Sequence, residues 1–158
     1  MYQSPSRLSA ETRAKLSSLL NARLADGLDL HSQLKVAHWN IKGPQFPSLH
    51  PLFETFANGL AAFNDALAER AVTLGGRAWG TARHVATAST LPEYPQETTR
   101  DLEHVRLLAE RFDRYLDGLR ESRRAAEQLG DTDTVDLFTQ VVTELEKHAW
   151  FLRASLDA

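Results

Sequence analysis

The chain lacks cysteine altogether, which excludes disulfide bonds and metal sites built from thiolates. It has no apolar run near the roughly 20 residues that a helix needs to cross a bilayer. Its first residues, MYQSPSRLSAETRAKL, contain no apolar core of a signal peptide. We therefore expect no membrane insertion and a cytoplasmic protein, with association to the nucleoid left open.

Lysine and clustered positive charge are also scarce. The 18 basic residues comprise 14 arginines and 4 lysines, they are dispersed, and the formal net charge is −3. Affinity for phosphate backbones comes from many clustered basic side chains. Because the N-terminus is short and nearly neutral, we expect direct DNA binding to be weak at physiological salt.

What the chain does contain is the composition of an ordinary globular protein, with 42% hydrophobic and 25% charged residues over 158 positions. We expect a single domain over residues 1–158, with residues 1–8 as a short N-terminal tail. Apolar side chains at helical spacing predict four long helices, over residues 9–40, 48–74, 96–129 and 131–156. Ser9 and Ser48 are the predicted caps of the first two, and Pro51 falls in the first turn of the second.

The connection over residues 77–95 is too long for a tight hairpin, and it includes a short predicted helix near residues 81–87. Four long helices with one such crossover match the ferritin-like variety of the four-helix bundle, an all-α fold. A ferritin holds two irons inside one bundle with Glu-x-x-His motifs. No glutamate here has a histidine three residues later, so the chain lacks the motif for a metal site inside one bundle. This absence favours a metal site between chains over one within a single chain.

The second long helix has two distinct faces. One carries His50 and Glu54, four residues apart, and also Asp65 and Glu69, again four apart. The residues among them are small or polar, so this face is either a solvated flank or the seat of a close partner. The other face is an apolar stripe that we assign to the core: Leu49, Phe53, Phe56, Leu60, Phe63, Leu67 and Leu74.

Each pair can aim its side chains at one point, but 15 residues separate His50 from Asp65, about 22 Å at ~1.5 Å per residue. One chain cannot join the two pairs in one metal site. Two copies of the helix, antiparallel about a two-fold axis, would bring His50 and Glu54 of one to Asp65 and Glu69 of the other. His38, at the end of the first helix, could swing in beside His50. This ligand set, which contains no thiolate, suits iron(II), manganese or zinc.

Three motifs carry a resemblance to the Dps family, the mini-ferritins that protect DNA in starved or oxidatively stressed bacteria. They are HWN (residues 38–40), G..F..LH..FE (residues 43–54) and D...ERAVTLGG (residues 65–76), in the family's order. The similarity extends over essentially the whole chain. The resemblance implies ferroxidase centres between two-fold-related subunits, with ligands from both: His38, His50 and Glu54 from one chain, Asp65 and Glu69 from the other.

The same resemblance implies hollow dodecamers that oxidise iron(II), preferentially with hydrogen peroxide, and store the ferric product inside. It implies that Trp39 lies near the site. Glu54 stands where many members of the family carry aspartate, and the longer carboxylate should still reach the metal.

An acidic group lies at the turn into the last helix. Asp131, Asp133 and their neighbours have an ordinary explanation as helix caps and first-turn residues. The resemblance adds a second role, because members of the family line three-fold pores with acids from this region to draw in cations. The four candidates are Glu127, Asp131, Asp133 and Asp136.

Three functions are compatible with these patterns. The first is an enzyme and storage cage that oxidises iron(II) with peroxide, and so protects DNA and the cell from oxidative damage. The second is a nucleoid or DNA-binding protein with an incidental metal site. The third is a non-catalytic helical oligomer in which the histidines and acids are only polar interface contacts.

Overall fold

The predicted all-α bundle is confirmed by a computed structural model, which describes residues 3–157. The described residues form five helices and no strand, apart from an isolated bridge between Lys42 and Arg100. None of these helices is long and apolar enough to span a membrane. The helices are α1 (Ala10–Asn40), α2 (Phe46–Thr73), α3 (Ala82–Ala88), α4 (Asp101–Gln128) and α5 (Thr132–Ala154).

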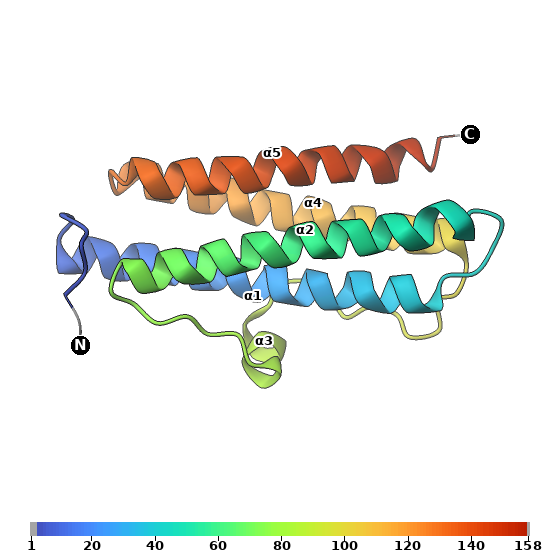
Figure 1. Cartoon of the computed structure of the whole chain (residues 1–158), viewed down its shortest axis with the longest axis horizontal. Coiled ribbons are helices and arrows are strands. Elements are labelled where there is room, and N and C mark those ends of the chain that lie inside the picture. Colours follow the sequence, from blue (N-terminus) through green and yellow to red (C-terminus); the bar gives the residue numbers. More distant parts are fainter. Residues whose placement is uncertain (1–2, 158) are drawn as a thin grey trace.

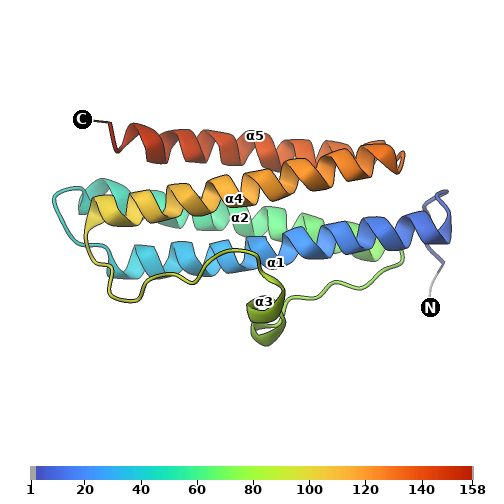
Figure 2. The same cartoon turned by 180° about the vertical axis from the view of Figure 1, so that it is seen from behind.

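The bundle consists of two antiparallel hairpins, α1 with α2 and α4 with α5 (Figures 1 and 2). The crossover after α2 runs back along the whole bundle, so that α4 starts at the same end as α2. The short helix α3 lies on this crossover, beside α1 and outside the four long helices. This is the ferritin-like connectivity that the 19-residue connection predicts.

The first helix begins as expected, but the second does not. The side chain of Ser9 accepts a hydrogen bond from the backbone N–H of Thr12, so Ser9 is the cap of α1. The predicted cap Ser48 is wrong, because α2 starts at Phe46 and Ser48 lies within its first turn. Pro51 consequently lies inside α2 rather than in its first turn.

A tertiary contact explains the early start of α2. The carboxylate of Asp101 accepts the backbone N–H of Gln45 at 2.7 Å, just before the helix. Gly43 allows this approach, because its φ is +136° and a Cβ there would lie 2.6 Å from the Asp101 carboxylate. The turn between α1 and α2 is thus fixed by the start of α4.

The same contact region delays α4. Its predicted start at residue 96 is wrong, because the helix begins at Asp101. The chain before it pairs with the α1–α2 turn: Lys42 N–H donates to the carbonyl of Thr99 at 2.7 Å, and Asp101 N–H donates to the carbonyl of Lys42 at 2.9 Å. Extended pairing therefore replaces the first turn that the sequence pattern predicts.

The apolar stripe of α2 forms the centre of the core. Phe53, Leu60 and Leu67 are completely buried, and Phe63 is the one member of the predicted stripe that is half-buried. Burial of such a side chain contributes about 1.5–3 kcal/mol. The face of α2 that carries the candidate ligands is less buried, because Asp65 and Glu69 are exposed and His50 and Glu54 are half-buried.

The predicted tail is held against the bundle where it is described. The Ser4 hydroxyl donates to the carbonyl of Thr73 at 2.7 Å, and the Arg13 guanidinium binds the carbonyls of Leu8 and Leu74. Residues 1 and 2 lie outside the described part of the chain. The tail therefore covers the end of α2.

Candidate metal centre

His38 and His50 fix each other where α1 turns into α2. Nδ1 of His38 lies 2.6 Å from the carbonyl oxygen of His50, and Nδ1 of His50 lies 2.7 Å from the carbonyl oxygen of His38. The rings stack with centroids 3.8 Å apart. Because a carbonyl oxygen only accepts, each Nδ1 carries the proton and each Nε2 of the neutral ring keeps its lone pair. This is the tautomer that a histidine needs to bind a metal through Nε2.

Glu54 follows His50 by one helical turn, and its carboxylate meets the imidazole of His38. Oε2 of Glu54 lies 3.4 Å from Nε2 of His38. Two acceptor atoms at that distance repel each other unless a proton or a cation lies nearby. Lys35 supplies such a charge, because its ammonium is paired with the same Oε2. This hydrogen bond from Lys35 holds the pKa of Glu54 below its usual range.

Asp65 and Glu69 lie further along α2 and are exposed. Eleven residues separate Asp65 from Glu54, about 16 Å of helix at ~1.5 Å per residue. Within residues 3–157, no three histidine or carboxylate side chains are positioned to hold a metal ion together. The fold therefore places His38 in contact with both His50 and Glu54, and leaves Asp65 and Glu69 apart from them.

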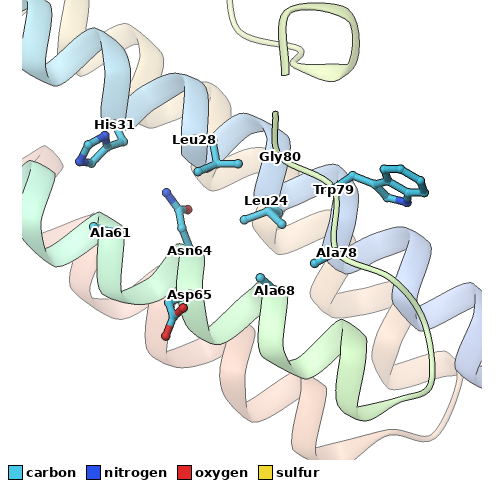
Figure 3. A pocket seen from close by; sticks show the side chains of 10 residues that line it. All are labelled: Leu24, Leu28, His31, Ala61, Asn64, Asp65, Ala68, Ala78, Trp79 and Gly80. Atoms are coloured by element: carbon cyan, nitrogen blue, oxygen red, sulfur yellow. The ribbon is translucent and has the colours of Figure 1, made fainter. Parts of the chain in front are cut away.

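A groove of about 380 Å³ runs between α1 and α2 beside Asp65 (Figure 3). Asn64 points into it toward α1, whereas Asp65 points away from α1. Asn64 is buried, and both of its amide atoms lack a hydrogen-bond partner. The rest of the wall is mostly apolar: Leu24, Leu28, His31, Ala61, Ala68, Ala78, Trp79 and Gly80. Asp65 is thus directed to the side where a second chain can reach it.

Sequence reasoning missed Lys35 and His31, which extend the centre along α1. They precede His38 by three and seven residues, so all three share one side of the helix. Burial lowers the pKa of His31, and the positive charge of Lys35 lowers it further. Their helical spacing from His38 is the signal that would have identified both. Phe46 was also missed, although its ring stacks on His50 with centroids 4.8 Å apart.

The acidic group divides into one buried and three exposed residues. Asp131 is 5% exposed and occupies the N-cap position of α5, where it binds Arg70 and Thr134. Burial alone would raise the pKa of Asp131, but hydrogen bonds from Thr134 and Arg70 hold that pKa below its usual range. Its carboxylate is therefore engaged within the chain, and its role in a pore stays a prediction. The exposed members are Glu127, Asp133 and Asp136, whose pore role stays a prediction.

Comparisons with known proteins agree with this architecture. The family described as ferritin-like domain matches residues 17–158. A relative from Agrobacterium fabrum, named DNA protection during starvation protein, is 35% identical over 156 residues, 99% of this chain and 96% of that protein. A relative of the same name from Mycolicibacterium smegmatis is 34% identical over 96% of this chain and 82% of its own length.

Solved structures are similar over nearly the whole chain. DpsC from Streptomyces coelicolor superposes with a TM-score of 0.94 at 33% identity, covering 99% of this chain and 92% of that chain. A Dps protein from Vibrio cholerae, described as a member of the ferritin-like diiron-carboxylate superfamily, superposes with a TM-score of 0.91 at 28% identity, covering 99% of both chains. The chain therefore belongs to the ferritin-like family and, within it, to the Dps proteins.

Proposed function

We propose that this protein oxidises iron(II) with hydrogen peroxide at centres shared between two-fold-related subunits, and stores the ferric product in a hollow dodecamer. The observation that carries the proposal is the separation of complementary half-sites on one helix. His50 and Glu54, with His38, supply nitrogen and oxygen ligands at one end of α2, and Asp65 and Glu69 supply carboxylates about 22 Å away by helix rise. Neither half is a metal site by itself.

An antiparallel pair of α2 helices joins the halves. If Glu54 faces the partner subunit's Asp65, then His50, one turn earlier, faces the partner subunit's Glu69, one turn later. Ala61 and other small residues on this face of α2 permit a close approach of the two helices. The two-fold axis repeats the arrangement, so that each dimer has two equivalent centres.

The chemistry follows from the ligands. Two imidazole nitrogens and three carboxylates bind iron(II) and favour the more highly charged iron(III) after oxidation. Two iron(II) ions give one electron each to one peroxide molecule, whose O–O bond breaks. With two water molecules the products are two FeO(OH) units and four protons. Because the peroxide takes both electrons at the protein, no hydroxyl radical leaves the site.

Related proteins support the cellular role. Curated relatives carry the name DNA protection during starvation protein, and the Vibrio cholerae protein is described as a ferritin-like diiron-carboxylate protein. We propose that this chain protects DNA by consuming iron(II) and peroxide rather than by wrapping DNA. The formal net charge of −3 favours protection without DNA wrapping. A gel shift at low and physiological salt tests whether the protein binds DNA. Zinc and manganese are the expected competitors for the centre.

Complementation between defective subunits tests the shared centre. One variant carries His38→Ala and His50→Ala, and the other carries Asp65→Ala and Glu69→Ala, so each alone should lose rapid iron oxidation. In a mixed dimer, one centre receives both defective halves and the other receives both intact halves. Activity should return with mixing, up to about one native centre per mixed dimer.

The matched control mixes two preparations of the same Asp65→Ala, Glu69→Ala variant. No centre in that mixture has intact carboxylates, so it should stay inactive. If mixed assemblies form but remain inactive, the shared centre is wrong. Mass measurement in solution tests the cage, because a stable monomer or isolated dimer contradicts storage in a hollow shell.

A further inference from the structure

We propose that the side chain of Asn58 enters the α1–α2 groove of the partner subunit and forms hydrogen bonds there with the amide of the partner subunit's Asn64. The two-fold axis repeats this contact, so each dimer contains two such amide pairs. The inference rests on the dimer of the proposed function and adds a contact that involves no metal ligand. It makes the interface selective for a second copy of this chain.

Asn64 is a buried polar residue whose hydrogen-bonding groups are not satisfied. It is 4% exposed, and neither atom of its amide has a partner within residues 3–157. Such an amide has two N–H donors and an oxygen that can accept two hydrogen bonds. Buried polar groups in native proteins are nearly always hydrogen-bonded, so the single chain lacks a partner that the assembled protein supplies.

A polar neighbour in the interior, the hydroxyl of Tyr115, does not remove this need. A Cβ at Gly27 would lie 2.1 Å from Oδ1 of Asn64 and 2.8 Å from this hydroxyl, so only glycine lets both side chains approach α1. Even if the hydroxyl turned toward Asn64, one hydrogen bond would leave most of the amide unsatisfied. The other partner has to come from the groove, into which Asn64 points (Figure 3).

The register of the dimer determines which residue meets the groove. Because Glu54 faces the partner subunit's Asp65 in the antiparallel pair, Asn58, one turn later, faces the partner subunit's Ala61. Asn58 lies on the same face of α2 as Glu54 and is exposed in the single chain. Ala61 lines the groove, and Asn64 follows it by three residues, about 4.5 Å of helix at ~1.5 Å per residue. Two asparagine side chains can bridge that offset.

The groove suits a small polar side chain at this place. It has a volume of about 380 Å³, and the small side chain of Ala61 leaves it open between His31 and Asn64 (Figure 3). Two asparagine amides are complementary, because each can donate an N–H to the oxygen of the other. The pair therefore satisfies two amides inside a mostly apolar groove.

Neighbouring residues of α2 offer no comparable group. Ala57, Ala61 and Ala62 have no polar side-chain atom. The hydroxyl of Thr55 already donates to the carbonyl of Pro51 within its own chain. Asn58 is therefore the expected occupant of the groove.

The amide pair makes the interface selective because a mismatch leaves a buried amide without a partner. A partner chain with an apolar residue at one of the two positions is penalised in this way. Apolar residues at both positions avoid the penalty, because removing both members of a buried hydrogen-bonded pair is nearly neutral.

Two single variants test the pair by their choice of partner. In a homodimer of Asn58→Leu, or of Asn64→Leu, two amides remain unpaired. In the mixed dimer one groove receives two leucines and the other two asparagines, so no amide is unpaired. When the two variants are assembled from equal amounts, their homodimeric interfaces should be at least about tenfold rarer than random pairing gives. Native mass spectrometry should then find assemblies with equal numbers of the two chains.

Two controls accompany this experiment. Gln140→Leu changes an exposed amide of α5, and its mixture with the unaltered chain should show the broad range of compositions that random pairing gives. The double variant Asn58→Leu, Asn64→Leu should assemble at a concentration within about tenfold of the unaltered protein, because neither amide remains. Its assembly also shows that both substitutions are compatible with the fold.

The outcomes separate this inference from the proposed function. A random composition of the mixed assemblies means that water satisfies Asn64, and segregation of the two variants means that the two Asn58 side chains pair with each other. Either result overturns the amide pair while iron oxidation at the shared centre stands. If the unaltered protein stays monomeric, or if the ligand variants do not complement each other, the proposed function itself fails.

Discussion

Asp131→Asn distinguishes a structural carboxylate from a pore carboxylate. In the structure, Nη2 of Arg70 lies 2.9 and 3.1 Å from the two oxygens of Asp131, and the hydroxyl of Thr134 also donates to this carboxylate. Removing one partner of a fully buried ion pair costs about 3–5 kcal/mol. Arg70 keeps 21% of its side chain exposed and asparagine keeps one acceptor, so we expect a smaller loss, about 2 kcal/mol.

Thermal unfolding at pH 7 measures this loss. In a chain of this length, each kcal/mol lowers the Tm by about 2–4 °C, so Asp131→Asn should lower it by about 4–8 °C. The matched control is Asp133→Asn, two residues away and exposed, which should change stability by less than about 0.5 kcal/mol. Iron uptake per folded molecule should not change in Asp131→Asn. An unchanged Tm together with slower uptake would refute the structural role.

The dependence of stability on pH gives a second check of the structural role of Asp131. The folded pKa of Asp131 lies below its usual value, so its carboxylate contributes full stability above the unfolded pKa of about 3.9. That contribution disappears as the pH falls through the lower folded pKa. The difference in Tm between the unaltered protein and Asp131→Asn should therefore stay constant from pH 7 to about pH 5 and shrink below about pH 4.

Three further predictions concern the iron reaction. Anaerobic loading with iron(II), followed by peroxide or by air, should give faster oxidation with peroxide, and equal or faster oxidation by air contradicts the peroxide route. Asp133→Asn combined with Asp136→Asn should slow iron uptake at low salt and less so at high salt, because screening weakens long-range attraction of cations; unchanged uptake would leave these acids as surface residues of α5. Lys35→Met should raise the affinity for cobalt(II), measured by anaerobic titration, by about tenfold, because a positive charge no longer competes for Oε2 of Glu54. The control is Lys147→Met, at an exposed lysine of α5. Equal affinity in both variants would show that Lys35 does not compete.

The helices were predictable where local pattern decides them, and less so where distant contacts do. The periodic leucines predicted the length of α1. The predicted short helix at residues 81–87 is shifted by one residue from α3. The predicted starts of α2 and α4 were wrong because Asp101 binds the backbone before α2 and Lys42 pairs with the chain before α4. Neither contact has a signal within its own segment of sequence.

The candidate site shows the same limit. Helical spacing separated His50 from Asp65 correctly, since the rise of a helix is fixed by its backbone. It could not reveal that His38 and His50 exchange hydrogen bonds through their carbonyl oxygens, because this depends on how α1 and α2 meet. It also could not separate Asp131 from its acidic neighbours, because the partner Arg70 lies 61 residues away.

The crossover has an electrical consequence. Because α2 and α4 start at one end of the bundle while α1 and α5 start at the other, each end combines two helix N-termini with two C-termini. A helix terminus carries about half a unit charge, positive at the N-terminus and negative at the C-terminus. At each end these charges oppose one another in pairs. Any preference for cations at the end of the bundle where α5 begins must then come from side chains such as Asp133 and Asp136, and substitution can remove it without altering the helices.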